Sequence, residues 1–177
     1  MKPFVNCRSR LSSRSGQALV EFTFVAATLL LLFFGLIDFC RAISVRQVIT
    51  SLSREGSNLA SRNTSLSNSI AAVLAASDPL NITNNGRIFI SVVINTNGTP
   101  WVADQMTFGG ISTNNNTDSK IGHPGGPAKM PVTNPSLPQL NQTIYVTEIY
   151  YSFEAVTPVG KVLNFALPPR LYDAAYF

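Results

Sequence analysis

The longest apolar run of the chain lies near its amino-terminal end. Residues 22–37 carry no formal charge over sixteen positions. Extended outward to Gln17 and Phe39, this run predicts a helix about 34 Å long at 1.5 Å per residue, which is enough to cross the hydrocarbon core of a membrane. One carboxylate, Glu21, lies inside the amino-terminal end of the run. The pattern predicts a transmembrane helix over residues 17–39.

An amphipathic pattern with helical spacing follows the apolar run. One face carries Val45, Val48, Ile49, Leu52, Gly56 and Leu59, and another carries Ser44, Gln47, Ser51, Arg54, Asn58 and Arg62. Such a stripe predicts that the helix continues past the membrane over residues 40–62 and packs its apolar face against a head. After a polar break, Leu66, Ile70, Val73 and Leu74 predict a short second helix that ends before Asp78.

The remaining residues, 63–177, predict an exported head with a small sheet. Residues 87–95 are apolar on both faces, as in an inner strand. The Asn97-Gly98 turn signal predicts that residues 101–108 return as a partner strand. The expected fold class is therefore α+β: a long amino-terminal transmembrane helix continues as an amphipathic spine and packs against a small antiparallel β-sheet head.

Two further strands are predicted after a long connection. Residues 109–141 are crowded with Gly, Pro, Asn and Thr, and form a connection that is long for a compact domain. Residues 143–156 then alternate as a strand does, and residues 162–167 predict a last strand. The alternation places Tyr145, Ile149, Tyr151 and Phe153 on one face, with Glu148, Ser152 and Glu154 on the other.

The charge of the chain is concentrated in residues 1–16. The net charge is +4, and Lys2, Arg8, Arg10 and Arg14 account for the excess, because basic and acidic residues balance in the rest of the chain. The head therefore shows no basic patch suited to nucleic acid. By the positive-inside rule, residues 1–16 form a cytoplasmic leader and the head lies across the membrane.

Three interpretations of the amino terminus follow from this pattern. A secretory signal peptide fits poorly, because its apolar region is normally shorter and small-residue cleavage signals are weak around Cys40. An uncleaved single-pass anchor is the plain alternative, with an exported head that binds a partner or ligand. A prepilin is the third, in which a peptidase cuts after a glycine just before the apolar helix.

The residues around Gly16 make the third interpretation specific. The segment Gly16-Gln17-Ala18-Leu19-Val20-Glu21-Phe22 resembles the processing site of prepilins of the tight-adherence (Tad, or Flp) class of type IV pili. The sequence after the apolar run resembles that of the TadE-like family of minor pilins and pseudopilins. The matching positions are Asp38, Phe39, Arg41, Arg54, Glu55 and Gly56, whereas Cys40 stands where glycine is common in the family.

The resemblance implies a function in pilus assembly. A prepilin peptidase would cut after Gly16, and Gln17 would carry the new α-amine about 6 Å along the helix from Glu21. The Glu21 carboxylate, next to the aromatic Phe22, would pair with the α-amine of a neighbouring pilin. Without a partner, Glu21 would only complement the helix dipole. The implied partners are the peptidase, other pilins and the lipid of a bacterial inner membrane, and the pilus would serve surface adhesion.

Other chemistry finds little support in the residues. The only histidine, His123, lies among glycines and a proline, and a mature chain would keep one cysteine, Cys40, so a metal site is not expected. No hydrolase elbow and no phosphate-binding loop is present. We expect no cofactor and no enzymatic activity. An exported enzyme is the weakest alternative.

Overall fold

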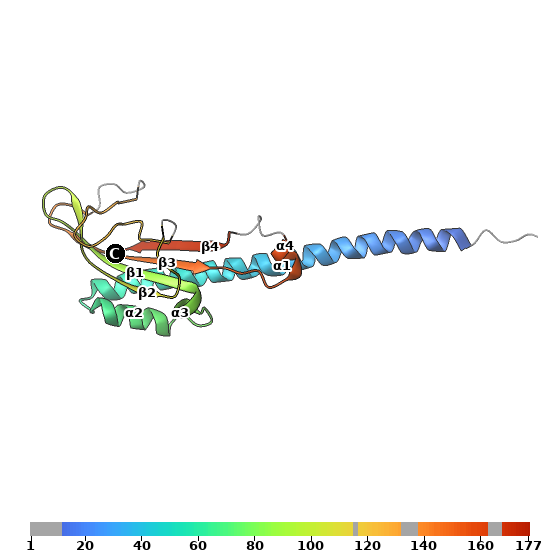
Figure 1. The fold of residues 1–177 in the computed structure, drawn as a ribbon, viewed down its shortest axis with the longest axis horizontal. Helices are drawn as coiled ribbons and strands as arrows, with labels where there is room; N and C mark the ends of the chain where they lie inside the picture. Colours follow the sequence, from blue (N-terminus) through green and yellow to red (C-terminus); the bar gives the residue numbers. More distant parts are fainter. Residues whose placement is uncertain (1–11, 115–116, 132–137, 163–167) are drawn as a thin grey trace, which may run out of the picture.

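The computed structural model describes residues 12–114, 117–131, 138–162 and 168–177. Its longest element is α1 (Ser12–Ser61), a helix of 50 residues. Figure 1 shows the amino-terminal part of α1 projecting alone, while a head packs along its carboxy-terminal part. A long apolar helix followed by a four-stranded antiparallel sheet confirms the predicted α+β class.

In the part of the chain that the structure describes, the head consists of one sheet and three short helices. In chain order its elements are α2 (Leu66–Ala75), α3 (Ile82–Asn85), β1 (Gly86–Asn95), β2 (Pro100–Gly109), β3 (Thr143–Ser152), α4 (Pro158–Val162) and β4 (Arg170–Tyr176). The strand order is β2-β1-β3-β4. The pairs are all antiparallel, and the register of β1 with β2 shifts between Val92 and Val93, where Ala103 of β2 is an extra residue.

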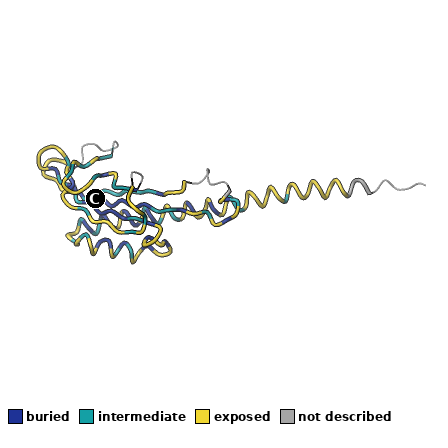
Figure 2. The backbone as a smooth tube through the Cα atoms, in the orientation of Figure 1, coloured by how far each residue is buried: buried dark blue, intermediate teal, exposed yellow. Residues whose placement is uncertain are grey.

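The main core lies between α1, α2 and the sheet. Ile49 and Leu52 of α1 are buried against Ile88, Ile90 and Ile149 of the two central strands. The predicted apolar face of the spine is thereby confirmed. Burial of each such side chain contributes about 1.5–3 kcal/mol relative to exposure, so this face holds the head on the helix. Figure 2 shows the buried backbone concentrated where α1 meets the sheet.

The amino-terminal part of α1 has no core to cover it. Its apolar side chains are exposed, with Leu19 at 69% and Phe24 at 72%, and Figure 2 shows this part of the helix exposed along its length. The helix is long and apolar enough to cross a membrane, with a mean hydropathy of 2.3 in its best window. Exposing this many large apolar side chains to water is unfavourable. A membrane-anchored protein accounts for the arrangement.

The long connection between β2 and β3 covers one face of the sheet. Within its described residues it contains no strand or helix, as predicted, and only an isolated bridge joins Pro127 to Trp101. Ile121 is buried in a second apolar cluster. The other buried members of this cluster are Val93, Val102, Ile144 and Val146. The connection is thus part of the head rather than a free loop.

Three expectations about the second half of the head are corrected. The strand expected to reach residue 156 ends at Ser152. The last strand is β4 (Arg170–Tyr176), whereas Val162 ends helix α4 and residues 163–167 lie outside the described residues. Glu148, placed by the alternation on the polar face, is fully buried, because the connection before β3 folds over that face.

Candidate functional site

The residues of the expected processing and assembly site lie on the bare part of α1. Gly16, Gln17, Glu21 and Phe22 are exposed, Phe22 by 71%. Within the described residues no basic side chain forms an ion pair with Glu21. The carboxylate therefore lies on an apolar helix with no ion-pair partner among the residues that the structure describes. An acid at the centre of a membrane helix costs about 2.5–3.5 kcal/mol on insertion scales, and less near an end, so a partner would be stabilising.

Gly16 lies inside the helix rather than before it. Helix α1 begins at Ser12, so the bond between Gly16 and Gln17 falls within the second helical turn. A Cβ built on Gly16 meets no atom within 4 Å. Glycine lowers helix stability by about 1 kcal/mol relative to alanine, and a helix end lacks half of its hydrogen bonds. Unwinding this turn therefore requires less free energy than unwinding a turn in the middle of α1.

Asp38 lies at the other end of the apolar run and is fully buried. Its Oδ1 accepts hydrogen bonds from the backbone N–H groups of Val156 at 3.0 Å and Thr157 at 3.3 Å. Its Oδ2 accepts a 2.5 Å hydrogen bond from the Thr157 hydroxyl. Hydrogen bonds to a charged acceptor are the strong ones, so Asp38 fastens the segment after β3 to α1. Asp38, one of the positions that match the TadE-like family, therefore has a structural role: its carboxylate holds the segment after β3 against α1.

Helix α4 begins beside the contact between Asp38 and Thr157. The Thr157 hydroxyl also accepts a hydrogen bond from the N–H of Gly160 at 3.0 Å, which caps the first turn of α4. A Cβ at Gly160 would overlap the Asp38 carboxylate. Only glycine therefore allows α4 to approach α1 this closely.

The neighbours of Asp38 divide between exposed positions and positions that contact the head. Phe39 is exposed by 55%, and Cys40 is an exposed free thiol. The guanidinium of Arg41 lies over the ring of Phe153, 5.8 Å from its centroid. Such a contact contributes about 0.5–1 kcal/mol at an exposed site. Arg41 thus also binds the end of β3 to the helix.

The Arg54-Glu55-Gly56 step lies deeper in the head. Arg54 and Glu55 are exposed and line a hollow of about 490 Å³ beside Phe177. Gly56 is buried, and a Cβ there would lie 2.9 Å from Oγ1 of Thr147 and 3.1 Å from a methyl of Val73. Gly56 therefore permits α1 to touch β3 and α2 together.

Sequence reasoning missed the two serines, Ser53 and Ser57, that flank the Arg54-Glu55-Gly56 step. Ser57 lies buried on α1, accepts a 2.9 Å hydrogen bond from the N–H of Thr147 and donates one of 2.8 Å to the carbonyl of Ala175. Thr147 and Ala175 face each other across β3 and β4, so the hydroxyl is inserted into that ladder. Ser53 donates to Asp173 at 2.6 Å. The only indication in the sequence was that these serines are polar residues on an otherwise apolar face of the helix.

The buried acid of β3 was also missed as an organising residue. Glu148 accepts hydrogen bonds from the Ser119 hydroxyl at 2.5 Å, the N–H of Lys120 at 2.9 Å and the Tyr172 hydroxyl at 2.8 Å. The Lys120 ammonium lies 3.5 Å from the centroid of the Tyr172 ring. These contacts tie the long connection and β4 to β3, because a buried carboxylate requires such donors.

Among the described residues no group of three or more His, Cys, Asp or Glu side chains is placed to hold a metal ion. His123 is exposed, as expected, with Nε2 3.0 Å from Oδ2 of Asp118. The five tyrosines of the chain all lie on β3 and β4, and Tyr150 is buried against Phe89 and Tyr172. The described contacts of these head residues are packing contacts.

Comparison with known proteins bears on the amino-terminal third. A family model described as TadE-like protein matches residues 16–58, which covers every candidate position named above from Gly16 to Gly56. No curated protein matches the chain, and no solved structure matches it. TadE-like proteins are structural pilus components rather than enzymes, and pilins interact with other pilins. The resemblance to the TadE-like family is therefore confirmed over residues 16–58, and that family suggests a minor pilin associated with a tight-adherence pilus.

Proposed function

We propose that this chain is a prepilin that a prepilin peptidase cleaves after Gly16, and that the mature protein takes part in assembling a tight-adherence pilus used in surface adhesion. The observation that carries the proposal is the TadE-like match that begins at Gly16, on a helix whose apolar surface is exposed. The leader would face the cytoplasm and the head the far side of an inner membrane, as the positive-inside rule predicts.

Cleavage would supply a cationic α-amine that can pair with the Glu21 carboxylate. The new α-amine at Gln17 is cationic near neutral pH and lies about 6 Å from Glu21 along the helix axis. In a bundle of staggered helices the amine of one subunit can approach the carboxylate of the next. In the low dielectric of the bilayer or filament core this attraction is much stronger than in water. The pair would then set the axial register between neighbouring pilins.

The position of the cleaved bond supports the same proposal. A peptidase needs an extended segment, and the Gly16–Gln17 bond lies near the start of α1, where unwinding breaks few hydrogen bonds. The absence of a side chain at Gly16 lets the backbone approach an active site closely. Cleavage deeper in α1 would require breaking the helix inside its apolar run.

Amino-terminal sequencing of the protein extracted from membranes tests the proposal. We expect the mature chain to begin at Gln17, and to begin at Met1 when the peptidase is deleted. Gly16→Val should block cleavage, whereas the matched Gly35→Val, which also adds side-chain volume in the apolar part of α1, should be cleaved normally. A chain that keeps Met1 in cells that form pili would contradict the proposal and favour the uncleaved single-pass anchor.

Deletion of the gene tests the assembly role separately. We expect loss or shortening of surface filaments and weaker adhesion, both restored by the wild-type chain. Restoration by the uncleavable Gly16→Val variant would show that the head acts from an anchored form. Unchanged filaments and adhesion after deletion would exclude an assembly function.

A further inference from the structure

The segment after β3 lies beside the end of the membrane span. The N–H of Val156 bonds to Asp38, which fixes Val156 at the same level along α1 as the last turn of the apolar run. Residues 17 and 38 are 21 steps apart, or about 32 Å along the helix, close to the thickness of a hydrocarbon core. Figure 1 shows α4 at the end of the head from which the bare helix projects. This end of the head therefore meets the bilayer surface.

An exposed apolar side chain marks the segment. Val156 is 63% exposed although its backbone is held by a buried carboxylate. On the adjoining turns of α1, Phe39 is 55% and Ile43 44% exposed. Apolar side chains of two separate segments are thus presented together at the level where the span ends. Burial of Val156 in the acyl boundary would remove its apolar surface from water.

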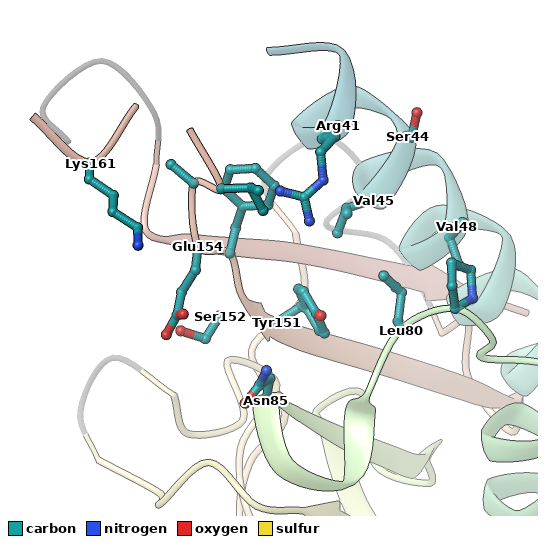
Figure 3. A pocket seen from close by; sticks show the side chains of 14 residues that line it. Arg41, Ser44, Val45, Val48, Leu80, Asn85, Tyr151, Ser152, Glu154 and Lys161 are labelled. Carbon is teal, nitrogen blue, oxygen red and sulfur yellow. The ribbon is translucent and has the colours of Figure 1, made fainter. Parts of the chain in front are cut away.

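Two cations lie just beyond these apolar side chains. Arg41 of α1 and Lys161 of α4 line a hollow of about 640 Å³ together with Val45, Val48, Tyr151 and Phe153. Within the described residues neither cation forms an ion pair. Glu154 also lines the hollow, and in Figure 3 its carboxylate points away from Arg41, toward the end of β3. Lys161 approaches the hollow from the side opposite α1 in the same view.

We propose that residues 154–161 dock the head on the bilayer, with Val156 entering the acyl boundary and Arg41 and Lys161 binding the phosphate groups of anionic phospholipids. Arginine matches phosphate geometry, and both side chains extend their apolar stems along apolar surface while their charges stay at the interface. The apolar walls of the hollow suit the glycerol and first methylenes of the same lipid. The inference rests on membrane anchoring and is independent of cleavage after Gly16.

Depth measurements with the full chain in nanodiscs test the docking. In a Trp101→Phe background, tryptophan is placed at position 156 or at position 140, since Val156 and Leu140 are both 63% exposed. Leu140 precedes the far end of β3, about 30 Å away. Phosphatidylcholine brominated near the headgroup should quench the Val156→Trp variant strongly and the Leu140→Trp variant little. Equal quenching of the two variants would overturn the proposal.

Lipid binding tests the two cations. The probe is phosphatidylglycerol that stays bound to the full chain after mild detergent extraction, measured by native mass spectrometry. We expect Arg41→Gln and Lys161→Gln each to weaken binding by about fivefold, and Arg62→Gln and Lys129→Gln, exposed cations elsewhere, to leave it unchanged. Inorganic phosphate should not displace the lipid. Equal binding by all four variants, or displacement by phosphate alone, would contradict docking on lipid, whatever amino terminus sequencing finds.

Discussion

The hydroxyl of Thr157 donates a 2.5 Å hydrogen bond to Asp38, a residue 119 positions earlier in the chain. This contact joins the end of the apolar run of α1 to the segment that follows β3. The contact gives Asp38 a structural role. The head buries and hydrogen-bonds its carboxylate at the end of the apolar run, where an unpaired charge would be unfavourable. The head and the span are therefore fixed to each other where they meet.

Asp38→Ala should release the segment after β3. The N–H groups of Val156 and Thr157 would lose a charged acceptor in a buried position, which costs about 3 kcal/mol. We expect amide hydrogen exchange at these two residues to accelerate by at least tenfold in detergent-solubilised full chain. Glu55→Ala, which removes an exposed acid from the same helix, is the control. Protected amides in the Asp38→Ala variant would show that packing alone holds the segment.

Ser57→Ala should destabilise the head more than its small size suggests. The hydroxyl accepts a hydrogen bond from the N–H of Thr147 and donates one to the carbonyl of Ala175, so both backbone groups lose this partner in the variant. Leaving such groups buried and unpaired costs about 2 kcal/mol. Chemical denaturation of the full chain in micelles measures the loss. Ser44→Ala removes an exposed hydroxyl that bonds only within α1, so this matched variant should unfold like the wild type.

Gly56→Val tests whether Gly56 stabilises the head through close packing or whether the substitution acts only through helix propensity. The added side chain would press on Thr147 and Val73, and overpacking of this kind costs about 1–3 kcal/mol. At Gly35 a Cβ meets no atom within 4 Å, so Gly35→Val makes the same chemical change without the clash. We expect the melting temperature of the head to fall by several degrees for Gly56→Val only. A similar fall for both variants would point to helix propensity as the cause.

The helical half of the fold could be predicted because its patterns are local. The apolar run, the spine stripe and the short second helix each recur at helical spacing within one segment, and α2 spans Leu66–Ala75 as its pattern predicts. The hairpin of β1 and β2 likewise follows from two apolar runs joined by Asn97-Gly98. These elements need no information about distant parts of the chain.

The sheet edge and the buried acid could not be predicted, because both depend on distant residues. Residues 170–176 look like an aromatic tail until β3 supplies hydrogen-bond partners for them. Glu148 looks like a solvent-facing residue until Ser119 and Lys120 fold over it. The contacts of Asp38 and Ser57 also span more than a hundred positions. Local spacing identified the motif residues but did not indicate what they touch.

Alkaline pH should destabilise the head through its tyrosines. Burial, together with the nearby Glu148 carboxylate, raises the pKa of Tyr172, and burial with Glu148 and Asp118 raises the pKa of Tyr150. The unfolded chain releases these protons near pH 10 while the folded chain retains them. The contribution to stability is therefore complete below about pH 10 and is lost as the pH rises further.

Thermal unfolding at pH 8 and at several values above pH 10 checks this sign. Tyr172→Phe removes one donor from Glu148, so the variant should be less stable than the wild type at pH 8. Because phenylalanine has no proton to release, the difference should narrow as the pH rises. Parallel stability curves for the two proteins would exclude Tyr172 as the titrating group.

Glu21→Gln should weaken association with other pilins without changing the head. Glu21 and the head share no contact within the described residues, so the melting temperature of the head should stay at the wild-type value. The amide keeps the shape of the side chain but removes the charge that the proposed α-amine partner needs. We expect co-purification with partner pilins from crosslinked membranes to fall at least tenfold, as the loss of a charge pair in a low-dielectric setting implies.

The matched variant for this experiment is Glu55→Gln, because Glu55 lies on the same helix, is exposed and belongs to the same family match. It should co-purify as the wild type does. The uncleavable Gly16→Val variant should behave like Glu21→Gln, since without cleavage there is no amine at Gln17 to pair with. If Glu21→Gln assembles normally while Gly16→Val does not, cleavage matters for a reason other than charge pairing, and Glu21 only complements the dipole of its helix.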